Sequence, residues 1–220
     1  MKRFLIVAVA FTLILTSVGC GRYGETNELT ETTQEEPYET FAHHDYTTLD
    51  FTSIEELIES HKAVREGKAV GRLAEKAEQE NFMELEKIYA PTVIPEEYHL
   101  YEIMVTEFYV RFIYLLESDM VSPDAVSQAF SEHQNFDFSF WRQGIDVTMD
   151  EALRRRNAAE EDLIDGKYLF DEPNSLTWEF DGVLFDLAVP LPLLEKQPDE
   201  QAKIAEMIKY AEVEDVDLGG

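Results

Sequence analysis

Basic residues are scarce in this chain, and their scarcity excludes several classes of partner. The 220 residues include 18 Lys and Arg against 46 Asp and Glu, which gives a formal net charge of −28. Contacts with nucleic acid or with an anionic membrane surface need clustered positive charge, so neither partner is expected. A negative field of this size attracts cationic partners or divalent ions, and it also keeps an exported domain soluble.

Cysteine is scarcer still, because Cys20 is the only one and no intrachain disulfide can form. It ends a segment in which Lys2 and Arg3 precede an uncharged run, Phe4–Val18. This is the layout of a secretory signal. The run is shorter than the roughly 20 apolar residues of a membrane-spanning helix, although an uncleaved anchor remains the alternative interpretation.

The last residues of this segment, Gly19 and Cys20, resemble the lipobox of bacterial lipoproteins. Ser17 departs from the pattern, because that family usually has leucine there. The resemblance implies that residues 1–19 are a signal peptide that is removed, and that Cys20 carries a diacylglycerol group. Two acyl chains hold a protein firmly at a bilayer. The expected location is therefore the extracytoplasmic face of the cell membrane, with a lipid anchor.

Residues 20–50 are predicted to be the anchor and an acidic tether, since this Thr- and Glu-rich stretch has no helical or strand period. His43 and His44 beside Asp45 are metal-ligand types, but adjacent histidines without further fixed ligands seldom make a specific site. We therefore predict no metal and no cofactor. Residues 51–218 have the length and the aromatic content for a single domain with a core.

Within this domain, the spacing of apolar residues is typical of helices in some segments and of strands in others. Helices are expected at residues 53–67, 72–89, 122–130, 148–157 and 198–211. Strands are expected at residues 98–105, 109–116, 136–140, 167–171, 176–180 and 183–189. The predicted fold class is α+β: an antiparallel sheet of about six strands built from hairpins, with helices at both ends and inserted, packed mainly on one face.

Several local signals support these elements. Ser53 and Glu56 form an S-x-x-E capping box, and His61 on the apolar stripe of the same helix is typical of a packing residue. Asp181 and Gly182 are a strong hairpin signal. The inward positions of the last helix are expected to include Ala202, Ala205, Ile208 and Ala211.

Arg154, Arg155 and Arg156 form the only basic cluster and are candidate binding residues. Guanidinium groups suit carboxylate or phosphate ligands. The alternative is that the cluster lies on a solvated helix and pairs with neighbours such as Glu151 and Glu160.

Trp141 is the other candidate binding residue. Strand alternation places it with Asp137 and Ser139, opposite the three phenylalanines of the same strand. An exposed indole there would stack on a sugar or cover a partner's apolar patch. The alternative is that Trp141 lies beneath a helix, and Trp178 is expected in the core.

Two segments, Tyr89–Ile103 and Asp162–Glu179, resemble a family of uncharacterised exported lipoproteins of Gram-positive bacteria. In that family a similar P-x-x-x-P-E-x-Y-x-L-Y segment precedes a hairpin, and a similar D-G-K-Y-L-F-x-E-P-N segment precedes a Trp-bearing strand. The similarity spans residues 82–218 and extends more distantly to extracytoplasmic domains attached to membrane anti-sigma regulators. Neither resemblance implies an activity or a site.

Sequence motifs of catalysis are also lacking, since neither G-x-S-x-G nor H-E-x-x-H nor a glycine-rich phosphate loop occurs. An EF-hand alignment of Glu161–Glu172 fails because Leu163 stands where a ligand oxygen belongs. We therefore expect a non-catalytic binding or sensing domain whose partner is an envelope protein, a peptide or a glycan. The alternatives are an envelope hydrolase, indicated by a polar groove with shifted pKa values, and a lipid or lipoprotein carrier, indicated by an apolar tunnel.

Overall fold

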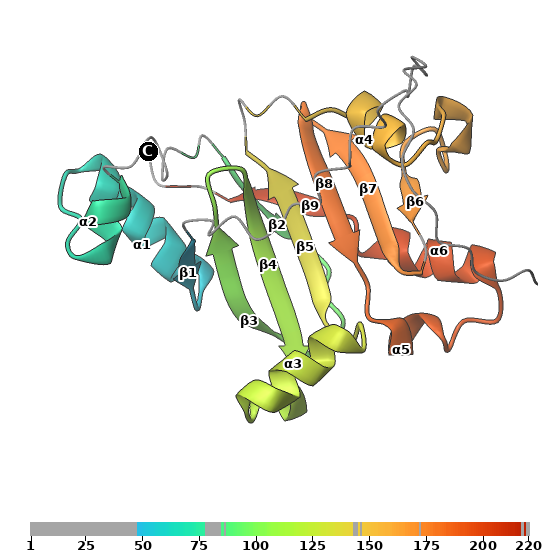
Figure 1. Cartoon of the computed structure of the whole chain (residues 1–220), viewed down its shortest axis with the longest axis horizontal. Helices are drawn as coiled ribbons and strands as arrows, with labels where there is room; N and C mark the ends of the chain where they lie inside the picture. Colours follow the sequence, from blue (N-terminus) through green and yellow to red (C-terminus); the bar gives the residue numbers. More distant parts are fainter. Residues whose placement is uncertain are drawn as a thin grey trace, which may run out of the picture. The chain divides into compact units, whose positions relative to one another are not determined.

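The structure is a computed structural model that describes residues 48–77, 85, 87–142, 145, 147–171, 173–216 and 218. Seven strands form one antiparallel sheet in the order β1-β3-β4-β5-β8-β7-β6 (Figure 1). Their bounds are Leu49–Phe51 (β1), Tyr98–Val105 (β3), Tyr109–Leu116 (β4), Phe136–Trp141 (β5), Leu169–Asp171 (β6), Ser175–Phe180 (β7) and Val183–Ala188 (β8). A second, two-stranded sheet pairs Ile88–Pro91 (β2) with Val213–Val216 (β9). The α+β class with an antiparallel sheet is confirmed.

The helices lie at the ends of the domain and between strands, as the sequence predicts. They are Ile54–Arg65 (α1), Arg72–Ala77 (α2), Pro123–Ser131 (α3), Met149–Arg155 (α4), Leu191–Leu194 (α5) and Glu200–Lys209 (α6), with 3-10 turns at Glu117–Met120 (η1) and Glu160–Asp162 (η2). The predicted cap of α1 is confirmed, because the Ser53 hydroxyl accepts a hydrogen bond from the Glu56 N–H at 3.1 Å. The Glu56 carboxylate accepts from Thr52 instead of Ser53.

One face of the main sheet carries the hydrophobic core. Phe136, Phe138 and Phe140 point to it from β5 and are almost completely buried. The second sheet packs on the same face, since Tyr89 of β2 lies edge-on to Phe140 and Phe185, with ring centroids 5.4 and 5.2 Å apart. The helices α1 and α6 add buried residues to the same core.

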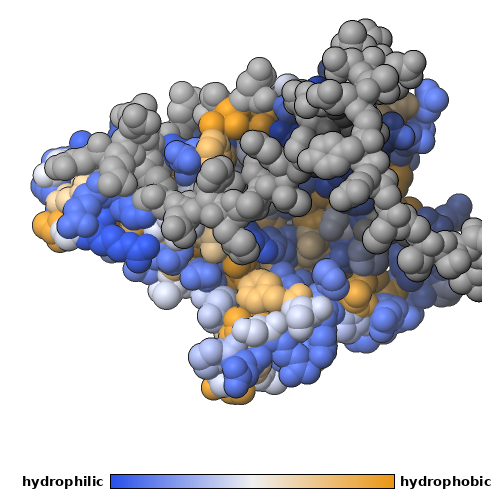
Figure 2. All heavy atoms as spheres, in the orientation of Figure 1, coloured by the Kyte–Doolittle hydropathy of each residue, from blue (hydrophilic) through white to orange (hydrophobic). Residues whose placement is uncertain are grey.

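On the other face, the helices α3 and α4 pack at opposite ends of the sheet. Ala129 of α3 is buried against Ile113 and Leu115 of β4. Residues of α4 form a second small cluster with Leu169 of β6 and Leu184 of β8. In Figure 1, α3 lies across the lower ends of β4 and β5, and α4 lies near the upper ends of β7 and β8. The surface over α1 and α3 is mostly hydrophilic (Figure 2), in keeping with the acidic composition.

The structure corrects the predicted 72–89 helix. The helix α2 ends at Ala77, residues 78–84 and 86 lie outside the described residues, and Ile88–Pro91 is a strand. This strand pairs with Val213–Val216, far along the chain, and no strand was predicted at either place. Non-local pairing has overridden local helix propensity here.

Two smaller expectations also differ from the structure. The sheet begins at Leu49, because β1 pairs with β3 inside the segment predicted as tether. In α6, Ala205 is exposed, and the fully buried residue is Met207.

His61 is a buried packing residue of α1, as predicted, with 1% of its surface exposed. Among the described residues, its Nδ1 has no hydrogen-bond partner. Burial lowers the pKa of His61 below 6.5, and the charge of Arg65 lowers it further, whereas a hydrogen bond with the Leu85 backbone opposes the shift. The unfolded chain therefore binds more protons than the folded one, and His61 reduces stability as the pH falls through about 6.5.

We expect His61→Gln, which keeps a side-chain N–H but does not titrate, to flatten the loss of stability between about pH 7.5 and about pH 5.5. Urea unfolding at both pH values measures this. The control is His99→Gln on the exposed side of β3, which should unfold with the pH dependence of the parent chain. An unchanged pH dependence in His61→Gln would mean that His61 binds the same number of protons in the folded and unfolded states, which would contradict the lowered pKa.

Candidate functional site

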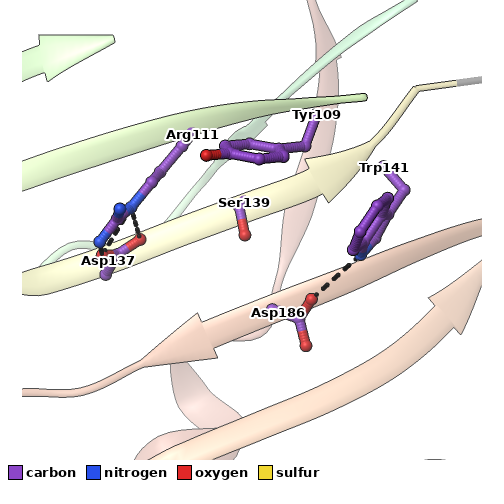
Figure 3. A pocket seen from close by; sticks show the side chains of 6 residues that line it. All are labelled: Tyr109, Arg111, Asp137, Ser139, Trp141 and Asp186. Carbon is purple, nitrogen blue, oxygen red and sulfur yellow. Dashed lines mark hydrogen bonds and ion pairs between the residues drawn. The ribbon is translucent and has the colours of Figure 1, made fainter. Parts of the chain in front are cut away.

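The strand register brings polar residues that are distant in sequence together on the second face of the sheet. Arg111 of β4 lies directly opposite Ser139 of β5, and Ser139 lies opposite Asp186 of β8. Residues opposite each other in an antiparallel pair share a face. These side chains line a cavity of about 280 Å³ (Figure 3). The lining residues are Tyr109, Arg111, Asp137, Ser139, Trp141 and Asp186.

Arg111 and Asp137 form a bidentate ion pair at one side of the cavity. The Arg111 Nε donates to Oδ1 and Oδ2 of Asp137 at 2.9 and 2.8 Å, and Nη2 also donates to Oδ2. Asn135 adds a donor at 3.3 Å. Only 13% of the Asp137 side chain is exposed. The carboxylate of Asp137 is therefore occupied within the protein, and it fixes the direction of the Arg111 guanidinium.

Asp186 lies at the other side, in contact with different donors. The Thr177 hydroxyl donates to its Oδ1, and the Trp141 Nε1–H donates to its Oδ2 at 3.3 Å. Arg156 Nη2 lies 3.8 Å from Oδ1. Burial raises the pKa of Asp186 and the Asp137 charge raises it further, against the lowering effects of Thr177, Arg156 and Trp141.

The Asp186 carboxylate keeps acceptor capacity for a ligand. About a third of its side chain, 36%, is accessible, although protein atoms surround the group on its remaining sides. Each oxygen accepts one hydrogen bond from a neutral donor among the described residues, and a carboxylate offers about four acceptor sites. Figure 3 shows Ser139 between the Arg111–Asp137 pair and the Trp141–Asp186 pair. The geometry thus leaves a polar floor between two anchored carboxylates.

The prediction that Trp141 shares a face with Asp137 and Ser139 is confirmed. The indole is half-buried, because one side packs against the small cluster formed with α4. Its ring centroid lies 6.2 Å from that of Tyr109, at 67° between the ring planes. Trp141 is therefore partly covered by a helix and partly in the wall of a cavity. Trp178 is in the core, as predicted.

The three arginines of the basic cluster do not act together. Arg154 and Arg155 pair with Glu151 at 3.5 and 2.6 Å on the exposed side of α4, as the solvated-helix alternative predicts. Arg156 does not pair with Glu160. It lies 3.5 Å from Asp171 and 3.8 Å from Asp186, so it alone reaches the margin of the cavity.

The sequence interpretation missed Arg111, Tyr109 and Asp186 as site residues. A signal was present, because Arg111 is a charge inside the otherwise apolar run of β4, and Asp186 interrupts β8 in the same way. A charged residue inside an apolar strand costs free energy unless it is paired or functional. The strand register that unites these residues is what the sequence does not give.

The remaining candidate sites lie elsewhere in the chain. Cys20, His43 and His44 are outside the described residues. Within the described ranges, no group of three or more metal-ligating side chains comes together. In the same part of the chain, no helix is both long enough and apolar enough to cross a bilayer.

Comparison with protein-family models, with curated proteins and with solved structures gives no match for this chain. The resemblance to exported lipoproteins therefore stays a prediction, and the cavity is the feature that bears on function.

Proposed function

We propose that this protein is a lipid-anchored extracytoplasmic envelope protein whose domain binds a small polar group in the cavity. The observation that carries the proposal is the Asp186 carboxylate, which is held beside an indole in a concave site and retains acceptor capacity. The volume of about 280 Å³ lies just below the range for ligand sites, about 300–1,000 Å³. It suits one sugar unit or one side chain.

The character of the lining bears on the lipid-carrier alternative. Four of the six lining residues are charged or carry only a hydroxyl, namely Arg111, Asp137, Ser139 and Asp186. An acyl chain would take these groups out of water and would offer no hydrogen bond to the acceptor sites of Asp186 that the protein leaves open, at a cost of about 1–3 kcal/mol. A polar ligand forms hydrogen bonds with these groups in place of the water that it displaces, so the lining favours a polar ligand.

The hydrolase alternative is favoured by one observation, the raised pKa of Asp186 in a cavity, which results chiefly from burial. Hydrolysis of a glycoside generally needs two carboxylates that act on the substrate. The second carboxylate of the lining, Asp137, is already bonded by Arg111 and Asn135. Binding without catalysis is therefore the function that the geometry supports better.

The strong negative charge of the chain explains why the proposal includes a lipid anchor. A protein with a net charge of −28 is repelled by an anionic leaflet, so electrostatic adhesion would not keep it at the membrane. A diacylglycerol thioether on Cys20 would supply that attachment.

Filling the cavity tests the binding proposal. We expect Ser139→Trp, at the floor of the cavity, to reduce affinity for the ligand by about tenfold or more, because the indole occupies the ligand's volume. The probe is an enzymatic digest of bacterial cell walls, and saturation-transfer NMR with the full chain in detergent identifies the components that bind.

The matched control is Ser127→Trp on the exposed side of α3, which should give the same signals as the parent chain. Melting temperatures of both variants verify that they are folded. Equal signals from Ser139→Trp and the parent chain, or none from the parent chain, would contradict binding in the cavity.

A further inference from the structure

The cavity lining carries a negative charge that is only partly compensated. Its charged groups are Arg111, Asp137 and Asp186, and the first two neutralise each other in a bidentate pair. The nearest cation to Asp186 is Arg156, which also lies 3.5 Å from Asp171. The single positive charge of Arg156 is thus shared between two carboxylates at the margin of the cavity. A ligand with a positive group beside Asp186 would complete the charge balance.

An aromatic ring lies beside the position that this positive group would occupy. Trp141 donates its Nε1–H to the Asp186 carboxylate, so the indole is held against the carboxylate at 3.3 Å. Indole faces attract ammonium groups, and they also stack on the apolar faces of sugar rings. Tyr109 adds a second ring to the same wall, inclined at 67° to the indole.

Two kinds of ligand carry an ammonium group, a lysine side chain and an amino sugar, and the polarity of the rest of the lining distinguishes between them. A lysine side chain would place four methylene groups along the wall, and such stems are stable against apolar surface. Here the stem would lie over Ser139 and beside the Arg111–Asp137 pair. A sugar ring instead presents hydroxyl groups to these side chains and one apolar face to Trp141.

We infer that the ligand group is an amino sugar with a free ammonium, bound with that ammonium at Asp186 and its ring against Trp141. The inference rests on the proposed binding function and specifies its ligand class. The overall charge of −28 favours the approach of such a cation.

Four probes test the inference by NMR titration of the full chain: glucosamine, glucose, N-acetylglucosamine and Nα-acetyl-lysine methylamide. We expect glucosamine to bind about tenfold or more tightly than the two uncharged sugars, because it alone among the three forms a charge-assisted bond with Asp186. Asp186→Asn should remove that preference. The matched control is Asp171→Asn, which alters the other carboxylate near Arg156 and should keep the preference.

The other outcomes overturn the inference in distinguishable ways. Equal affinity for all three sugars would refute recognition of an ammonium group by Asp186. Tighter binding of the lysine compound would show that the ligand is a peptide. If no probe binds while the cell-wall digest still gives signals that Ser139→Trp removes, the assignment of an amino sugar as ligand is wrong, but the proposal that the cavity binds a polar ligand is retained. If the digest gives no such signals either, both proposals fail.

Discussion

Replacing Phe138 with alanine is expected to lower the free energy of unfolding by about 3–5 kcal/mol. Phe138 lies in β5, the central strand of the seven, and has 0% of its surface exposed. Its ring centroid is 5.9 Å from those of Phe112 and Phe185, and 6.4 Å from that of Trp178. Because hydrogen-bonded strands hold these rings on both sides, the space left by the truncation cannot close easily.

Urea or guanidinium unfolding of the parent chain and the variant measures this loss. Phe180→Ala provides the matched control, since Phe180 lies in the same sheet with 50% of its surface exposed. We expect it to change the free energy of unfolding by about 0.5 kcal/mol or less. Similar losses in the two variants would contradict the assignment of the core to the β5 face that carries Phe138.

Replacing Cys20 with alanine is expected to abolish retention at the membrane almost completely. Without the sulfur no thioether can form, so the chain should either be released into the medium or keep residues 1–19. Cell fractionation followed by mass spectrometry of the N-terminus distinguishes these results from lipidation. The control is Ser17→Leu, which introduces the residue usual in the lipobox and should remain lipidated.

An unchanged membrane fraction and unchanged processing in Cys20→Ala would refute the lipid anchor. The cavity proposal would survive that result, because it rests on residues of the folded domain. The attachment through Cys20 would then have to be replaced by the uncleaved anchor.

Local sequence signals predicted most elements of the main sheet. The bounds of β3 and β4 agree with the predicted strands, because both runs are apolar and are separated by a short turn. The hairpin between β7 and β8 is also confirmed. Asp181 and Gly182 both have positive φ, 53° and 71°, as a two-residue hairpin turn with right-handed strand twist requires.

Non-local pairing explains the elements that were missed. The strands β1, β2 and β9 have three or four residues each, so a period of two hardly appears in them. Each is stabilised by a partner strand elsewhere in the chain, and its own sequence does not specify that partner. Local propensity then favoured a helix over 72–89 and a tether up to residue 50.

The candidate site was predictable only in part for the same reason. Alternation alone placed Trp141 with Asp137 and Ser139, because all three lie in one strand. Asp186 joins them through the pairing of β5 with β8, and Arg111 through the pairing of β4 with β5. Which strands become neighbours is decided by packing of the whole domain, so one strand's sequence cannot show its partner's side chains.

The two tryptophans of the chain allow a direct test of binding in the cavity. Trp141 lies in the cavity wall, and Trp178 is 1% exposed in the core on the opposite face. Each gives one indole N–H resonance in the spectrum of the ¹⁵N-labelled chain, so Trp178 is an internal control. On addition of the cell-wall digest, the Trp141 resonance should shift and the Trp178 resonance should stay in place. A bound component that leaves the Trp141 resonance unmoved, or that moves only Trp178, would contradict ligand binding at this site.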